Sequence, residues 1–205
     1  NTAWVDYCHH QLESGLSKIF KFFIRVTGWK KRLERDMIAG DFSQRPAPLP
    51  KSLVTNYRII ETELNSRTIW QIQPKENKSP RTILFLHGGA YVYNITPIHW
   101  QFIALLVKET NATIIVPDYP LAPQAQSQDL YSFMEALYED LLSKGSPESF
   151  IFLGDSAGAG LALGYAQYLR IENKPLPQQL ILISPWLDIS MSNPEIRNIE
   201  NQDPM

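Results

Sequence analysis

The sequence predicts an α/β fold with a mostly parallel central sheet and helices on both faces. Four short runs are almost free of polar side chains, which is typical of strands buried on both faces. These runs are residues 82–86, 113–117, 150–153 and 180–184. Helical patterns lie between them, at residues 98–109, 127–143 and 158–172. Such alternation of strand and helix indicates parallel strands joined by crossover helices.

An antiparallel pair of strands is expected ahead of the parallel ones. The segments 57–64 and 67–73 are rich in β-branched and apolar residues, and only Asn65 and Ser66 separate them. Short polar residues in this position are typical of the tight turn of a β-hairpin. The expected sheet is therefore mostly, but not wholly, parallel.

The first fifty residues have a different pattern. Apolar side chains recur there at steps of three and four residues, which predicts an amphipathic helix at residues 12–26. We expect this helix to cover the protein's own apolar surface; its basic residues leave binding at a membrane surface as the alternative. The proline-rich segment 45–50 predicts an extended connector. We therefore divide the chain into an N-terminal helical cap with its connector, residues 1–50, and a core, residues 51–205.

Charge and composition narrow the choice of partners and compartment. The chain of 205 residues has 19 basic and 21 acidic side chains and a net charge of −2, which does not favour binding to nucleic acid. Its single cysteine, Cys8, fits a reducing compartment. No apolar run reaches the roughly 18 residues that a membrane-spanning helix needs. We therefore expect a cytoplasmic protein that does not insert stably into membranes and binds a neutral or weakly charged small molecule.

A serine stands between two glycines after the third apolar run. Gly154, Asp155, Ser156, Ala157 and Gly158 match the pattern G-x-S-x-G, between a predicted buried strand and a predicted helix. This context is typical of a nucleophile elbow, a turn so tight that the serine is strained and its flanking positions need glycine. The serine hydroxyl then lies beside the free N–H groups at the start of the helix. The five residues alone would also suit a phosphate-binding turn.

A second glycine motif follows the first apolar run. Residues 86–91 have the sequence LHGGAY, whose glycines leave backbone N–H groups unobstructed at the carboxyl end of the preceding strand. We expect the amides of Gly88, Gly89, Ala90 and Ala157 to form an oxyanion hole, which stabilises the negative oxygen of a tetrahedral acyl intermediate. The chain between the two motifs is long enough to bring both to one edge of the sheet. This convergence favours acyl transfer over phosphate binding.

Four motifs in this order resemble a known family. HGGAY, DYPLAPQ, GDSAGAG and SPWLD, within residues 87–188, are similar to motifs of the hormone-sensitive-lipase-like α/β-hydrolases. The resemblance implies an α/β-hydrolase fold and a carboxylester hydrolase with Ser156 as nucleophile and an N-terminal cap over the acyl pocket. Two motifs depart from the family pattern: Ala90 replaces the third glycine of HGGG, and Pro120 and Gln124 replace the arginine and glutamate of DYRLAPE. Alanine keeps the backbone N–H, so the first departure leaves the oxyanion hole intact.

The histidine of a serine triad is missing from its expected place. That histidine takes the serine proton, and a carboxylate orients it. In α/β-hydrolases it follows both the serine and the acid along the chain, whereas all four histidines here precede Ser156: His9, His10, His87 and His99. We expect His87 to organise the oxyanion turn by hydrogen bonding and His99 to begin or cap the next helix.

The triad acid is also not evident. Asp188 belongs to the SPWLD motif, whose aspartate the resemblance marks as structural, and it remains only a weaker candidate. Asp155 is expected to anchor local backbone, and Asp118 is expected to be structural. We therefore expect the triad aspartate and histidine, and the last strands of the fold, to lie beyond Met205, and residues 1–205 alone to be inactive.

Two functions of different classes fit these observations. The first is a serine carboxylesterase that cleaves short- to medium-chain acyl esters through an acyl-enzyme at Ser156, with arylformamidase or amidase activity as a variant. The second is a non-catalytic protein that binds a small ligand on the same scaffold. Six aromatic side chains suit either an apolar pocket or ordinary core packing: Phe20, Phe22, Phe23, Tyr91, Tyr93 and Trp186. Neither a metal nor another cofactor is expected, and the sequence leaves a homo-oligomer open.

Overall fold

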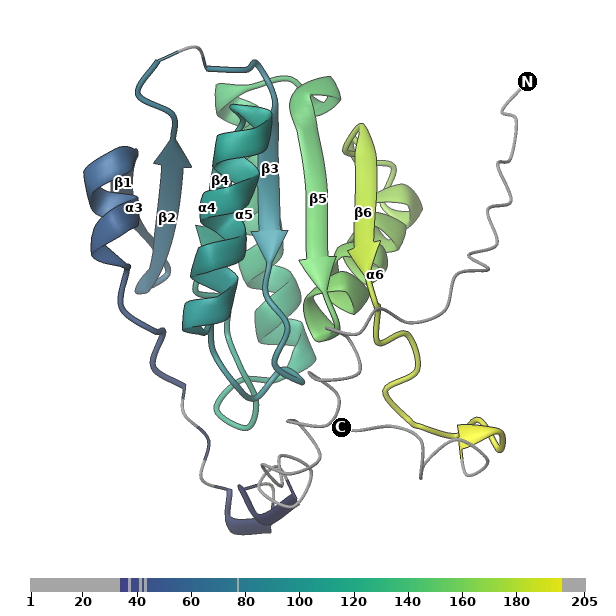
Figure 1. The fold of residues 1–205 in the computed structure, drawn as a ribbon. Coiled ribbons are helices and arrows are strands. Elements are labelled where there is room, and N and C mark those ends of the chain that lie inside the picture. Colours follow the sequence, from purple (N-terminus) through teal and green to yellow (C-terminus); the bar gives the residue numbers. More distant parts are fainter. Residues whose placement is uncertain (1–33, 37, 41, 43, 77, 197–205) are drawn as a thin grey trace, which may run out of the picture. The chain divides into compact units, whose positions relative to one another are not determined.

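The computed structural model describes residues 34–36, 38–40, 42, 44–76 and 78–196 (Figure 1). The chain divides into two compact units, Asn1–Asp41 with Ser190–Met205, and Phe42–Ile189. In the first unit, residues 34–36 and 38–39 are helical. The amphipathic helix predicted at residues 12–26 lies outside the described residues. The second unit contains the sheet and all the sequence motifs.

A six-stranded mixed sheet forms the centre of the second unit (Figure 1). Its strands follow the order β1-β2-β4-β3-β5-β6. The last four in the chain are mutually parallel, and β2 pairs antiparallel with both β1 and β4. The strands are β1 Arg58–Leu64, β2 Arg67–Gln73, β3 Thr82–Leu86, β4 Thr113–Pro117, β5 Phe150–Asp155 and β6 Gln179–Ile183. The prediction of a mostly parallel sheet is confirmed.

The first two strands form the predicted hairpin. Leu64 of β1 pairs with Arg67 of β2, so the loop contains two residues. Both of them, Asn65 and Ser66, have positive φ angles, 50° and 61°. This is the backbone of a two-residue turn whose twist matches that of the flanking strands.

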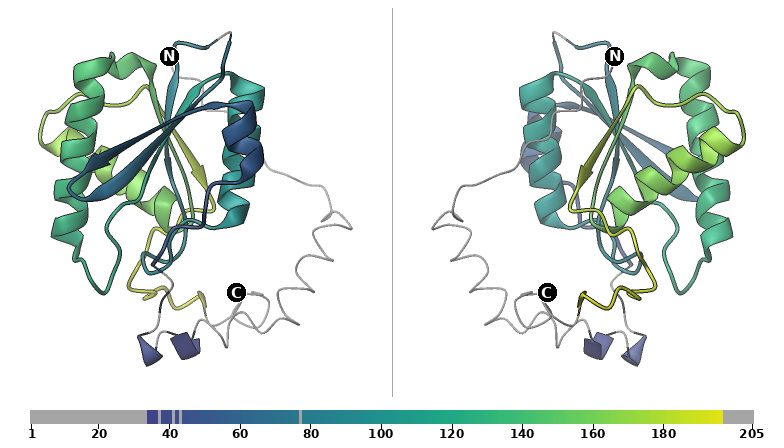
Figure 2. Two further views of the ribbon diagram at one scale, coloured as in Figure 1. Left: turned by 90° about the vertical axis from the view of Figure 1, so that its left-hand side faces the viewer. Right: turned by 90° about the vertical axis from the view of Figure 1, so that its right-hand side faces the viewer.

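Helices cover both faces of the sheet, as Figure 2 shows from the two edges. They are α3 Lys51–Asn56, α4 Pro97–Thr110, α5 Ser127–Lys144 and α6 Ala157–Ile171, with a short 3-10 helix at Pro147–Ser149. Side chains of α3 and α4 pack on one face, where the Trp70 and Trp100 rings meet at 5.2 Å. Side chains of α5 and α6 pack on the other face, around Phe152 and Tyr165. The helices at residues 98–109, 127–143 and 158–172 were predicted; α3 was not.

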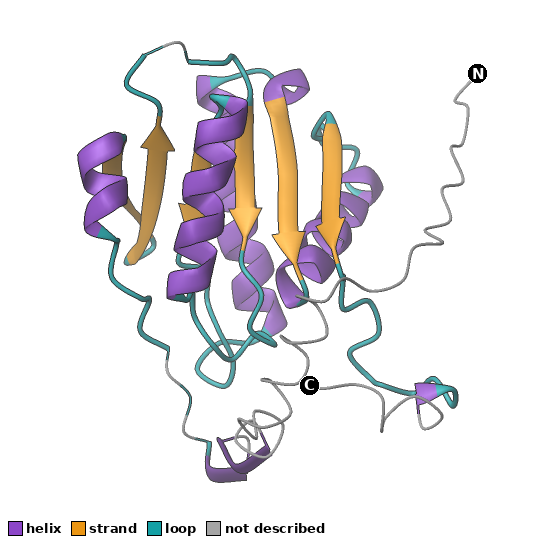
Figure 3. Ribbon diagram, in the orientation of Figure 1, coloured by secondary structure: helices purple, strands orange, loops and turns teal. Residues whose placement is uncertain are grey.

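The connections at the carboxyl ends of the parallel strands lie together at the lower edge of the sheet in Figure 3. The central strand β3 has β4 on one side and β5 on the other, so the strand order reverses at this point. In open α/β sheets, ligands bind at the carboxyl ends of the strands beside such a reversal.

Within the described part of the chain, no helix has the length and apolar character needed to cross a bilayer.

Candidate active site

Ser156 occupies a sharp turn between β5 and α6. Its φ and ψ angles are 50° and −118°, a combination that is costly for a residue with a Cβ. Its N–H donates to the Ile183 carbonyl at 2.9 Å, and its carbonyl accepts from Gly160 and Trp186, each at 3.0 Å. The end of β6 and the loop after it therefore hold the strained backbone that the elbow motif predicts.

Close packing explains the two glycines that flank the serine. A Cβ on Gly154 would lie 2.5 Å from the carbonyl of Gly158. A Cβ on Gly158 would overlap the carbonyl oxygens of Leu86 and His87. Any larger residue at position 158 would therefore push the start of α6 away from the end of β3.

The oxyanion turn follows β3 and lies next to the elbow. In the sheet register Leu86, at the end of β3, pairs with Gly154 near the end of β5. Gly89 has a φ of 133°, and its carbonyl accepts from the amides of Val92 and Tyr93 at 3.0 and 2.8 Å. Ala90 has a φ of 54°. The backbone therefore bends sharply where the sequence predicts the oxyanion donors.

One of the four expected donors is already engaged. The Gly88 N–H donates to Asp155 Oδ1 at 2.9 Å. The sequence analysis predicted a free donor at this position, and that prediction is wrong. Among the described residues, none accepts a hydrogen bond from the amides of Gly89, Ala90 or Ala157. The arrangement thus leaves three amides available, two from the oxyanion turn and one at the start of α6.

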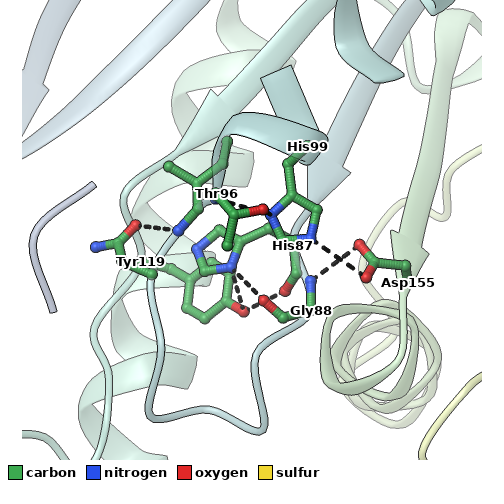
Figure 4. A network of polar contacts seen from close by, with 8 residues as sticks. His87, Gly88, Thr96, His99, Tyr119 and Asp155 are labelled. Carbon is green, nitrogen blue, oxygen red and sulfur yellow. Dashed lines mark hydrogen bonds and ion pairs between the residues drawn. The ribbon is translucent and has the colours of Figure 1, made fainter. Parts of the chain in front are cut away.

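Asp155 also faces His99 on α4 (Figure 4). The Thr96 N–H donates to His99 Nδ1 at 3.0 Å, which completes the capping box of α4 and confirms the predicted capping role. Nδ1 accepts this bond and so carries no proton, whereas the N–H at Nε2 lies 3.4 Å from Asp155 Oδ2. Burial raises the pKa of Asp155, but the hydrogen bond and electrostatic interaction with His99, followed by the Gly88 amide, outweigh it and lower the pKa below its ordinary value. Asp155 is therefore an ionised anchor between β5, the oxyanion turn and α4.

His87 is fully buried at the start of the oxyanion turn. Its Nδ1–H donates to the Gly88 carbonyl at 2.8 Å, as expected for a residue that organises this turn. Nε2 then has no proton, and it has no hydrogen-bond partner among the described residues. Burial lowers the pKa of His87 to about 4 and the electrostatic interaction with His99 adds to this effect, although the Gly88 carbonyl and Asp155 oppose it. The ring is therefore neutral at physiological pH.

Tyr119 is a site residue that the sequence analysis missed. Its ring stacks on His87 with centroids 4.3 Å apart, and its hydroxyl donates to the His87 carbonyl at 2.5 Å. Tyr119 is fully buried, like an ordinary core residue, so burial alone would not single it out. The available signal was its place in the DYPLAPQ motif, just after β4, which neighbours β3.

The remaining aspartates have structural contacts. Asp118 accepts from Asn94 Nδ2 at 2.7 Å and lies 3.7 Å from Arg67, in agreement with a structural role. The carbonyl of Asp188 accepts from Trp186 Nε1 at 2.9 Å.

Neither His87 nor His99 hydrogen-bonds to the Ser156 hydroxyl, and His9 and His10 lie outside the described residues. Among the residues that the structure describes, no group of three or more His, Cys, Asp or Glu side chains could hold a metal ion.

Sequence comparison identifies the family. A family model described as the alpha/beta hydrolase fold matches residues 83–205. The chain belongs to this family. A triacylglycerol lipase of Mycobacterium tuberculosis is 29% identical over 164 residues, which are 78% of this chain and 37% of the relative. An esterase of Acinetobacter venetianus is 33% identical over 122 residues, 59% of this chain and 40% of the relative. The chain thus spans about two fifths of the length of these relatives.

Solved structures show the same fold for this α/β-hydrolase. The esterase EstE5 superposes with a TM-score of 0.74 and 23% identity, over 94% of this chain and 65% of EstE5. An esterase from the bacterial hormone-sensitive lipase family superposes with a TM-score of 0.69 and 24% identity, over 95% of this chain and 65% of that esterase. The predicted α/β-hydrolase fold and family resemblance are confirmed.

A cavity of about 700 Å³ opens beside the elbow. We call it the α5–α6 cavity, because α5, α6 and the loops after β3, β4 and β6 contribute its walls. Tyr91 and Trp186 line it, as expected of the aromatic pocket, with ring centroids 6.1 Å apart. Tyr93 instead packs against Phe42 at 5.6 Å. The aromatic residues Phe20, Phe22 and Phe23 lie outside the described residues.

Proposed function

We propose that the chain is the nucleophile-bearing part of a serine carboxylesterase that cleaves short- to medium-chain acyl esters. The main support is the junction of two turns: Gly88 of the oxyanion turn hydrogen-bonds to Asp155, the residue before Ser156. This bond brings the amides of Gly89 and Ala90 to the same edge of the sheet as the amide of Ala157. The names of two relatives, a triacylglycerol lipase and an esterase, also support ester hydrolysis.

The proposed reaction proceeds through an acyl-enzyme. Ser156 Oγ attacks the ester carbonyl carbon while a general base takes the hydroxyl proton. The carbonyl oxygen becomes negative and accepts hydrogen bonds from Gly89, Ala90 and Ala157, each worth roughly 2.7–4 kcal/mol in such holes. The C–O bond to the alcohol breaks as the alcohol takes the proton. Water then attacks the acyl-enzyme by the same route and releases the carboxylic acid and the serine.

The base and acid of this reaction are proposed to come from sequence beyond Met205. Both nitrogens of His99 already have partners, Thr96 and Asp155. Burial keeps His87 neutral, and one of its nitrogens is engaged with Gly88. Each histidine therefore serves the oxyanion turn in this proposal, and neither serves as the base.

A non-catalytic ligand-binding protein is the second candidate. One observation favours it: neither described histidine hydrogen-bonds to the Ser156 hydroxyl. Arylformamidase or amidase chemistry would use the same site if the leaving nitrogen were protonated. For either class we propose a cytoplasmic protein whose partner is an uncharged small molecule.

Labelling of the full-length protein with a fluorophosphonate separates these classes. We expect Ser156 to become covalently modified and hydrolysis of p-nitrophenyl butyrate to be detectable. Ser156→Ala should abolish both, whereas Ser143→Ala, on the exposed surface of α5, should leave both unchanged. A folded full-length protein with an unreactive Ser156 would contradict the esterase and favour the ligand-binding protein.

A further inference from the structure

We propose that the α5–α6 cavity binds one arm of the ester, an uncharged arm that carries a hydrogen-bond-accepting oxygen. This inference rests on the proposed esterase function and names the substrate class of its site. The volume of about 700 Å³ lies within the range of small-molecule binding sites.

The cavity begins next to the proposed reacting centre. Ala90, which contributes one of the free amides, forms part of its wall. So does Gly160, whose N–H donates to the Ser156 carbonyl at 3.0 Å. Trp186 lines the cavity as well, and its backbone N–H donates to the Ser156 carbonyl. A group attached to the ester carbon at Ser156 therefore has the cavity as its neighbour.

Two glycines on one face of α6 create much of the space. Gly160 and Gly164 are four residues apart and both line the cavity, as expected of positions one helical turn apart. A Cβ on Gly164 would lie 2.8 Å from the hydroxyl of Tyr131. A Cβ on Gly160 would lie 3.2 Å from the hydroxyl of Tyr91 and would overlap the Trp186 carbonyl. The two tyrosine hydroxyls therefore lie against the helix where these side chains are absent.

The hydroxyls of Tyr91 and Tyr131 have no hydrogen-bond acceptor among the described residues. Burial raises the pKa of Tyr91 to about 12, with a further contribution from Tyr131. Burial also raises the pKa of Tyr131. Both groups therefore remain protonated at neutral pH. Neither hydroxyl hydrogen-bonds to a described residue, and neither is among the fully buried atoms without a partner, so water can reach both. Gln126 and Gln167 add amide groups to the wall.

The composition of the wall determines which arm fits. Among the described residues that line the cavity none has a charged side chain, so this part of the wall offers no counter-charge to an ionised arm. Most of the remaining lining is aliphatic or aromatic, which suits a carbon chain. A purely aliphatic chain, however, would remove water from the Tyr91 and Tyr131 hydroxyls and leave them unpaired. An ether, ketone or hydroxyl oxygen on the arm would accept their hydrogen bonds.

The test compares matched esters with the full-length protein. For the acyl arm, p-nitrophenyl levulinate is compared with p-nitrophenyl pentanoate; for the alcohol arm, methoxyethyl acetate is compared with butyl acetate. We expect kcat/KM to favour the oxygen-bearing member of at least one pair by about tenfold, as sites that hydrogen-bond a substrate discriminate against analogues that lack the group.

Two tyrosine variants isolate the contact. Tyr131→Phe should remove most of the preference, because it should lower kcat/KM for the oxygen-bearing esters more than for the aliphatic ones. Tyr168→Phe is the matched control, because its ring packs on Tyr131 at 5.6 Å but its hydroxyl faces Glu135 instead of the cavity. Tyr168→Phe should keep the preference.

Gly164→Ala, which reduces the space beside Tyr131, should lower kcat/KM for the longer arm more than for an acetyl arm.

The possible failures are distinguishable. Efficient hydrolysis with no preference in either pair would overturn this inference and leave the esterase intact. The same conclusion would follow if Tyr131→Phe and Tyr168→Phe had equal effects. Absence of both hydrolysis and fluorophosphonate labelling would instead refute the proposed function, and this inference with it.

Discussion

Asp155 links three parts of the site through one carboxylate. Oδ1 accepts from the Gly88 amide and Oδ2 faces His99 Nε2, while the next residue in the chain is Ser156. The Gly88 position has no space for a side chain, because a Cβ there would overlap Asp155 Oδ2. The carboxylate thus holds the oxyanion turn next to Ser156, the proposed nucleophile.

Replacing Asp155 by Asn should impair catalysis more than substrate binding. The amide oxygen can still accept from Gly88, but the amide N–H groups then face the His99 Nε2–H, so two donors oppose each other. His99 cannot move this proton to Nδ1 without losing the bond from Thr96. The oxyanion turn should shift, and loss of aligned donors lowers kcat by roughly 10²–10³ in comparable sites. Steady-state kinetics of the full-length protein should show a lower kcat with a smaller change in KM.

A surface aspartate provides the control for this prediction. Asp140→Asn changes a carboxylate of α5 that is paired with Lys144 and lies away from the site. It should leave kcat within about twofold, since surface substitutions have small effects. A similarly small effect of Asp155→Asn would show that the carboxylate does not position the turn.

Helix α6 contains two glycines whose replacement should have opposite effects. A Cβ at Gly158 would overlap backbone carbonyls of Leu86 and His87, which cannot move without disturbing β3. Gly158→Ala should therefore lower the free energy of unfolding by about 1–3 kcal/mol. At Gly164 the nearest atom is the hydroxyl of Tyr131, at the end of a side chain that can move. Gly164→Ala should be neutral or stabilising by up to about 1 kcal/mol, through helix propensity.

Urea unfolding of the two variants tests this difference. Both substitutions add one methyl group to the same helix, so the difference between their effects reports mainly on the contact of position 158 with the end of β3. Equal midpoints for the two variants would show that the start of α6 is not packed as tightly as the structure indicates.

The elements could be predicted because their signals are local. The apolar runs at residues 82–86 and 113–117 coincide with β3 and β4, and Asn65 and Ser66 identify the hairpin turn. Helix α3 was missed because six residues with one buried side chain, Leu53, form no recognisable period. Its burial depends on the other elements of the core, including Trp100.

The site could be predicted only as far as its backbone motifs reach. The glycines of the elbow and the oxyanion turn have direct steric reasons that sequence displays. The engagement of the Gly88 amide by Asp155 was not predictable, because it depends on the register that pairs β3 with β5. The stacking of Tyr119 on His87 depends in the same way on the adjacency of β3 and β4.

At the scale of the whole molecule, the reversal of strand order concentrates buried and half-buried polar groups at one edge of the sheet. His87 follows β3, Tyr119 follows β4, and Asp155 ends β5. Adjacent strands thus bring these groups together in a region shielded from water. Such burial makes the protonation of His87 costly for the folded state, so the stability of the whole fold should depend on pH.

The stability of the full-length protein should fall as pH drops from about 6.5 to about 4. Burial lowers the pKa of His87 from 6.5 to about 4, so in this range the unfolded chain binds a proton that the folded protein does not. At about pH 4.5 the loss is about 2.5 kcal/mol relative to neutral pH. The lowered pKa of Asp155 acts in a different pH range, since the stability that this carboxylate contributes disappears only below about pH 4.

Urea unfolding at neutral pH and at about pH 4.5 should show that His87→Asn, although less stable at neutral pH, loses less stability on acidification. The other titrating groups are common to both proteins, so an equal loss in the variant would mean that His87 is not held neutral by burial.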